Sequence, residues 1–125
     1  MVNIVGIAAR TPGDDFLIGG SANAAIANFS KGLAQLGKRD GVNVNVIHPG
    51  TTETERTHKV LAQRAGASRR PIEELRSETL AREGLRRLGH PDDIAAVALF
   101  LCTERARHIQ GTAIAVDGGA TPGLY

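Results

Sequence analysis

Few residues in this chain have the type and setting for chemistry. The single cysteine, Cys102, lies in an apolar stretch beside Phe100 and Leu101, which favours a buried thiol that packs as a small hydrophobe. One cysteine allows no disulfide within the chain. The four histidines do not have metal-ligand spacing, so we expect no metal site; they are His48, His58, His90 and His108.

A turn after an apolar run is the better candidate for a binding site. Pro49 would end a strand there, and Gly50 would let a ligand approach the backbone closely. Thr52 and Thr54 add hydroxyl groups to the same turn. The alternative is a strand-ending turn that the threonines merely cap, and the residues alone leave both interpretations open. Further along, Asp117 could bind a ligand, but we expect it to fix the turn that follows the last strand.

The elements that would position this turn alternate between strands and helices. Short β-branched runs predict three strands, at Val2–Ile7, Val42–Ile47 and Ala113–Asp117. Helical periodicity predicts a helix over Ala22–Leu36, with Ser21 as its N-cap and Gly37 at its end. Such alternation predicts an α/β fold with a parallel sheet.

The remaining helices are predicted in the second half of the chain. Two weakly amphipathic segments predict helices near Glu53–Ala65 and Pro71–Arg82. A third helix is predicted over Pro91–Glu104, because Pro91 suits a first helical turn and Asp92 and Asp93 complement the helix dipole there.

Two motifs give the chain a family resemblance. Residues 87–119 read RLGHPDDIAAVALFLCTERARHIQGTAIAVDGG, and residues 41–50 read GVNVNVIHPG. They resemble the signatures R-x-G-x-P-E-D-I-A, I-T-G-x-x-I-x-V-D-G-G and G-I-R-V-N-x-I-x-P-G of the short-chain dehydrogenase/reductase family. The resemblance implies the C-terminal part of a Rossmann-like, doubly wound parallel sheet, in which the three predicted strands are adjacent in their sequence order. Residues 1–125 would form one partial domain, with residues 51–86 in the position of the variable substrate lid.

The resemblance also implies an activity, that of an NAD(P)-dependent oxidoreductase. In the family, Pro-Gly is followed by x-I-x-T, whose backbone and threonine contact the nicotinamide carboxamide. Pro49, Gly50, Thr52 and Thr54 stand at those positions and are the implied cofactor-binding residues. The family's glycine-rich pyrophosphate motif is missing, as is the residue that selects NAD or NADP. We therefore expect this chain alone to bind neither cofactor.

The family's catalytic positions hold no proton-transfer group. Its Ser, Tyr and Lys positions correspond to Gly6, Gly19 and Asn23. The longer spacing of the family's enoyl reductases would place Phe16 at the Tyr position instead. Tyr125, the only tyrosine, could reach a site only by wrapping back or entering a neighbouring molecule. No catalytic residue is therefore assigned, and the chain is expected to be inactive alone.

Composition excludes several classes of function. Fifteen basic residues nearly balance 13 acidic ones, and no basic run carries interleaved aromatic residues, which argues against nucleic-acid binding. No apolar window approaches the length of a membrane span, and Met1 does not begin a signal peptide. We expect no membrane association and a cytoplasmic location.

Three interpretations follow. The first is the C-terminal fragment of an oxidoreductase, and the second is a non-catalytic scaffold or regulatory subunit that kept the fold. The third, an enzyme of different chemistry, would have only Ser21 and His48 to use. As partner we expect a second copy of the chain or the missing N-terminal half. The first strand would lack a neighbour on one side, and the helix over Ala22–Leu33 carries an apolar face with small residues.

Overall fold

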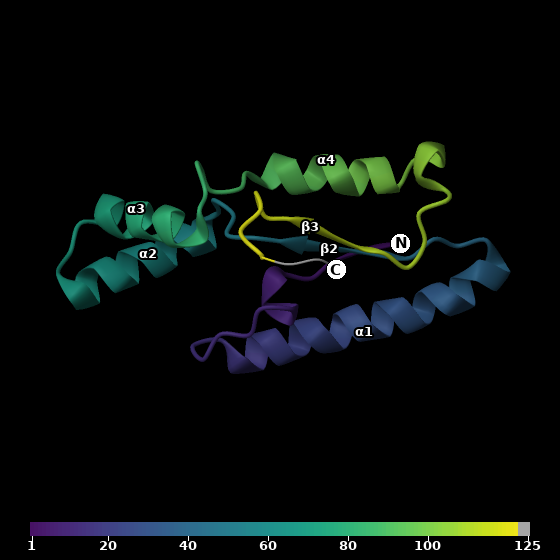
Figure 1. Ribbon diagram of the computed structural model, residues 1–125, viewed down its shortest axis with the longest axis horizontal. Coiled ribbons are helices and arrows are strands. Elements are labelled where there is room, and N and C mark those ends of the chain that lie inside the picture. Colours follow the sequence, from purple (N-terminus) through teal and green to yellow (C-terminus); the bar gives the residue numbers. More distant parts are fainter. Residues whose placement is uncertain (123–125) are drawn as a thin grey trace.

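The computed structural model describes residues 1–122 and contains one parallel sheet (Figure 1). Its strands are β1 (Val2–Ile4), β2 (Asn45–Pro49) and β3 (Ala113–Val116), adjacent in the order β1–β2–β3. Residues 2 and 45 are paired between β1 and β2, and residues 46 and 113 between β2 and β3. The predicted α/β class, the parallel direction and the strand order are confirmed.

The first strand is shorter than predicted. β1 ends at Ile4, and a short 3-10 helix, η1 (Ile7–Ala9), follows Gly6. Gly6 has φ 148°, a value that favours glycine over other residues. The strand prediction to Ile7 was wrong because an apolar run does not reveal this change of backbone conformation.

Four α-helices surround the sheet. They are α1 (Leu17–Asp40), α2 (Glu55–Ser68), α3 (Ile72–Glu83) and α4 (Pro91–Leu101), and a 3-10 helix, η2 (Glu104–Ala106), follows α4. Figure 1 shows α1 on one face of the sheet, α4 on the other, and α2 with α3 beyond the carboxyl ends of the strands. All four helices occur near their predicted positions, with ends that differ by a few residues.

The ends of α1 differ most from the prediction. Phe16, not Ser21, is the N-cap residue, and the helix ends at Gly41, whose φ of 68° is left-handed. Gly37 is a buried position inside the helix, where a Cβ would overlap the carbonyl oxygen of Val42. This glycine is therefore needed for the chain to return across the helix toward β2, and it does not end the helix.

The main core lies between α4 and the sheet. Ile47 of β2 is fully buried against Leu101 and Ala106, and partly buried side chains surround these three. Because Ile47 sits in the central strand, this cluster ties α4 to the sheet whose central strand leads into the turn at residues 49–54.

Long-range side-chain hydrogen bonds hold the strands to their surroundings. The amide of Asn45 donates to Ile109 O (2.8 Å) and its oxygen accepts from Thr112 N (3.1 Å). Asn3 donates to the hydroxyl of buried Ser30 at 2.7 Å. Both asparagines therefore join segments that are distant in sequence.

One expectation about burial fails. Cys102 is exposed, because it caps the end of α4 instead of lying within it. The apolar face of α1, which we expected to contact another chain, points away from the sheet: Ile18 is 90% exposed and Phe29 65%. The buried positions of α1 are small residues, namely Gly20, Ser30, Ala34 and Gly37. Among residues 1–122, none of the helices has the length and apolar character to cross a bilayer.

Candidate functional site

The predicted binding turn lies where β2 and β3 end side by side. Gly50 N donates to Val116 O at 3.1 Å, directly after the last pair of the two strands. A Cβ on Gly50 would lie 2.7 Å from Cβ and 2.9 Å from Cα of Asp117. Because the second of these atoms is backbone, this close approach requires glycine. Carboxyl ends of parallel strands are the usual place for ligands in α/β sheets.

Threonine hydroxyls organise the rest of the turn. Thr52 Oγ1 donates to Gly50 O (3.0 Å), and Thr57 Oγ1 donates to Thr52 O. Thr54 Oγ1 accepts from Thr57 N (3.3 Å) and so caps the N-terminus of α2. These contacts are those of the threonine-capped turn that the sequence left as one alternative, and they present the ordered backbone of Gly50 at the sheet edge.

Asp117 fixes the turn after β3, as expected from the sequence. Its carboxylate oxygens accept from Gly119 N (2.9 Å) and Thr121 N (3.0 Å). Partial burial acts to raise the pKa of Asp117, but the hydrogen bonds from Thr121 and Gly119 outweigh it and hold that pKa below its ordinary value. Asp117 is therefore a carboxylate anion whose oxygens already accept hydrogen bonds from backbone amides.

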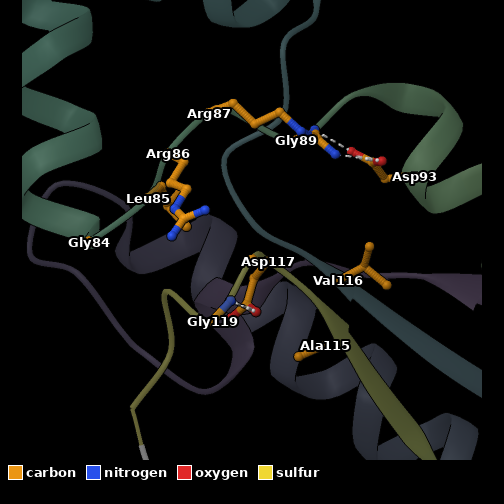
Figure 2. A pocket seen from close by; sticks show the side chains of 11 residues that line it. Gly84, Leu85, Arg86, Arg87, Gly89, Asp93, Ala115, Val116, Asp117 and Gly119 are labelled. Carbon is orange, nitrogen blue, oxygen red and sulfur yellow. Dashed lines mark hydrogen bonds and ion pairs between the residues drawn. The ribbon is translucent and has the colours of Figure 1, made fainter.

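A cavity of about 560 Å³ opens between this turn and the loop before α4 (Figure 2). Figure 2 shows Arg86 pointing into the space between that loop and the turn at Gly119. Arg87 instead makes a two-pronged ion pair with Asp93, at 2.7 and 2.9 Å.

Asp93 lies in the first turn of α4, as the sequence predicted. It also accepts from His90 N at 2.6 Å, and His90 caps the same helix. The hydrogen bonds from Arg87, then that from His90, hold the pKa of Asp93 far below its ordinary value. The pair therefore locks the loop of residues 87–89 to α4.

The positions that correspond to the family's catalytic groups come together beside η1 and the start of α1. A Cβ on Gly6 would lie 3.2 Å from Asn23 Nδ2. A Cβ on Gly19 would fall inside the ring of Phe16, which therefore covers the helix at that position. Arg56 of α2 lies above the same ring, 5.8 Å from its centre. None of Gly6, Gly19, Asn23 and Phe16 carries a group suited to proton transfer near neutral pH.

His48 contacts the backbone of this region. It is 1% exposed, and its Nδ1 lies 2.7 Å from the carbonyl oxygen of Gly6. A carbonyl oxygen only accepts, so Nδ1 carries the proton in this contact. Sequence reasoning missed this contact, since nothing in the spacing of the two residues indicates it.

The other candidates for chemistry are not assembled. Ser21 lies on the exposed side of α1, and among residues 1–122 no hydrogen bond joins it to His48. Within the same residues, His, Cys, Asp and Glu side chains form no group of three that could hold a metal ion. Tyr125 lies outside the described residues.

A second cavity, of about 250 Å³, lies between α2 and α3, and one of its lining residues is the Arg56 that lies over Phe16. Its apolar floor includes Leu61 and Leu88, which are 7% and 4% exposed. Four arginines and one glutamate line it: Arg56, Arg64, Arg76, Arg82 and Glu83. Sequence reasoning missed this cluster, although residues 56, 60 and 64 and residues 76, 79 and 83 have the spacing of single helix faces.

Comparisons with known proteins place these features in one family. The family model described as enoyl-(acyl carrier protein) reductase matches residues 1–121. The NADPH-dependent reductase BacG of Bacillus subtilis is 30% identical over 122 residues, which are 96% of this chain and 46% of that protein. Inactive 2-(S)-hydroxypropyl-CoM dehydrogenase 2 of Xanthobacter autotrophicus is 34% identical over 102 residues, 81% of this chain and 42% of that protein.

Solved structures give the same result. L-sorbose reductase from Gluconobacter frateurii, solved with NADPH and L-sorbose, has a TM-score of 0.90 and 30% identity. The match covers 98% of this chain and 47% of that one. The chain thus spans about half the length of the proteins that it matches.

Proposed function

The chain belongs to the short-chain dehydrogenase/reductase family, and from this we propose that it forms the C-terminal half of a nicotinamide-dependent oxidoreductase site, without proton-transfer chemistry of its own. The observation that carries the proposal is the cluster of Gly6, Gly19 and Asn23. The fold brings these positions to one place, yet it fills that place with the ring of Phe16 and an amide.

The binding role is proposed for the turn at residues 49–54. Gly50 is pressed against Asp117, and its neighbours are held by threonine hydroxyls, so the backbone at the sheet edge is ordered. A rigid backbone offers amide and carbonyl groups in fixed positions, which suits a planar carboxamide. Pro49, Gly50, Thr52 and Thr54 would contact the nicotinamide, while residues outside this chain would hold the pyrophosphate.

A chimera tests this binding role. In it, this chain replaces the matching half of BacG, whose own N-terminal half supplies the remaining strands. We expect the folded chimera to bind NADPH, read as an increase in nicotinamide fluorescence. Thr54→Val should weaken that binding about tenfold, whereas Thr54→Ser keeps the hydroxyl and should restore it. Equal NADPH affinity of all three folded chimeras would remove Thr54 from the site.

A second candidate function is a scaffold or regulatory subunit. One observation favours it: a relative with 34% identity is itself named inactive. The DNA sequence upstream of codon 1 separates the two candidates. An in-frame glycine-rich strand–helix unit there supports the oxidoreductase half, whereas a stop codon followed by a ribosome-binding site supports the separate subunit.

The chain is also proposed to associate with itself or with the missing half. β1 is an edge strand, and its Ile4 is 52% exposed. The outward side of α1 adds exposed Ile18 and Phe29. An unpaired strand edge and an apolar helix face are both surfaces on which another chain can dock.

A further inference from the structure

The cavity between α2 and α3 has a composition that the proposed nicotinamide contact does not use. Its floor is apolar, with buried Leu61 and Leu88 and the more exposed Val60, and its rim carries the four arginines. The volume of about 250 Å³ lies just below the usual range of about 300–1,000 Å³ for ligand sites in proteins, so only a small ligand fits. Such a site fits a small molecule with one apolar and one anionic part.

Two of the four arginines make only exposed ion pairs with neighbouring carboxylates. Arg64 pairs with Asp15 at 3.3 Å, and Arg82 with Glu83 at 3.3 Å. Both arginine side chains are more than half exposed, and exposed ion pairs of this kind contribute little to stability. A ligand anion can therefore compete for either guanidinium.

Of the four arginines, Arg56 is the most available to a ligand anion. Within residues 1–122 no carboxylate pairs with it, and its guanidinium lies over the ring of Phe16. Because that ring covers Gly19, Arg56 stands between the cavity and the family's tyrosine position. An anion bound by Arg56 would thus lie between the cavity and the proposed nicotinamide site, on the side from which a substrate would enter.

The single acidic side chain that lines the cavity, Glu83, makes a structural hydrogen bond. Glu83 Oε1 accepts from Thr51 Oγ1 at 3.0 Å, so this carboxylate ties α3 to the turn after β2. Arg76 is engaged more firmly than the others, at 3.0 Å from Glu53, with both side chains about one-third exposed. The positive potential of the cavity therefore comes mainly from Arg56, Arg64 and Arg82.

We propose that this cavity binds a small carboxylate with a short apolar chain, the head meeting Arg56 and Arg82 and the chain lying on Leu61 and Leu88. Guanidinium groups bind carboxylates through paired, charge-assisted hydrogen bonds. The proposal names a substrate class for the site proposed above and rests on it for its functional meaning. Binding itself needs neither cofactor nor hydride transfer.

The test is a titration of the ¹⁵N-labelled full chain with hexanoate, followed by NMR. We expect chemical-shift changes at the amides of α2 and α3, such as Thr57 and Thr79, that saturate with hexanoate. Hexanamide has the same shape without the charge, and inorganic phosphate is an anion without the chain. Each should bind at least tenfold more weakly.

Two double variants complete the test. Arg56→Gln with Arg82→Gln should weaken hexanoate binding tenfold or more, whereas Arg105→Gln with Arg107→Gln, which lie outside the cavity on η2 and its end, should not. The proposal is overturned if hexanoate shifts no amide of α2 or α3, if hexanamide or phosphate binds as well, or if both double variants behave alike. The nicotinamide contact is read separately in the chimera, so either proposal can fail without the other.

Discussion

The ring of Phe16 lies across the backbone of Gly19, one helical turn further along, where a Cβ would fall 2.0 Å from the ring. A side chain at residue 19 and the ring of Phe16 cannot occupy this position together. Glycine inside a helix lowers the stability of the helix by about 1 kcal/mol relative to alanine. At residue 19 this loss is accompanied by the space that the ring of Phe16 needs.

This relationship predicts a coupling between the two residues. In the Phe16→Ala background, Gly19→Ala should stabilise the chain by about 0.5–1 kcal/mol through helix propensity. With Phe16 present, the same change must displace the ring from Gly19 and from Arg56, so the gain should shrink or reverse. Urea unfolding of the four proteins measures the difference, and an identical effect of Gly19→Ala in both backgrounds would contradict the contact.

A second prediction concerns the contact between Gly50 and Asp117. Gly50→Ala should destabilise the chain by about 1–3 kcal/mol, because the new Cβ meets the backbone of Asp117, directly after β3, and this contact cannot be relieved by a rotamer change. Gly66→Ala is the matched control: Gly66 lies in α2 with nothing near its Cβ position, and should gain about 0.5–1 kcal/mol. Urea midpoints for the two variants that move in the same direction would rule out the close approach.

A third prediction follows from the ion pair of Arg87 and Asp93. The pKa of Asp93 is lowered in the folded chain, so its contribution to stability is present above the unfolded pKa of about 3.9 and is lost as the pH falls toward the folded value. Asp93→Asn should therefore lower the melting temperature at pH 7, and the gap to the parent chain should narrow steadily below about pH 4.

Asp92→Asn serves as the control for this experiment. Asp92 is its exposed neighbour in the same helical turn, and no arginine pairs with it among residues 1–122. Its effect on the melting temperature should be much smaller. A gap for Asp93→Asn that stays constant from pH 7 to pH 2 would show that the carboxylate charge does not matter.

A fourth prediction concerns association. If the outward face of α1 is covered by another copy, the chain should sediment as a dimer or larger species at micromolar concentration. Ile18→Glu with Phe29→Glu should then give a monomer, because two charges would have to be buried. Lys59→Glu on exposed α2 should leave the assembly intact. A parent chain that sediments as a monomer would disprove association through this face.

The sequence predicted the architecture because the patterns that specify it are local. β-branched runs and helical periodicity predicted the three strands and the four helices, and the family motifs added the order of the strands. What it could not predict depends on contacts between distant segments. The sequence predicts a helix end at Gly37, because the approach of Val42 that requires this glycine is a contact between segments and leaves no local pattern. Helical periodicity likewise does not show by itself which side of α1 faces the sheet.

The candidate site was predictable only in part. The motif after β2 identified the turn at residues 49–54, and the family spacing identified Gly6, Gly19 and Asn23. The ring of Phe16 over Gly19, the link from His48 to Gly6 and the arginines around the cavity required the fold. Each of these joins residues whose distance in sequence carries no signal, except for the helical spacing of the arginines.

The most direct test of the central claim is the rate of NADPH and NADH oxidation by the pure chain, its intact mass verified, with a set of small carbonyl compounds. The absence of a general acid alone removes about 10²–10⁴ in rate, and without the pyrophosphate motif the hydride donor is not held. The account predicts no oxidation above the protein-free blank. Steady oxidation that disappears when a residue of this chain is substituted, Asn23→Ala for instance, would contradict it.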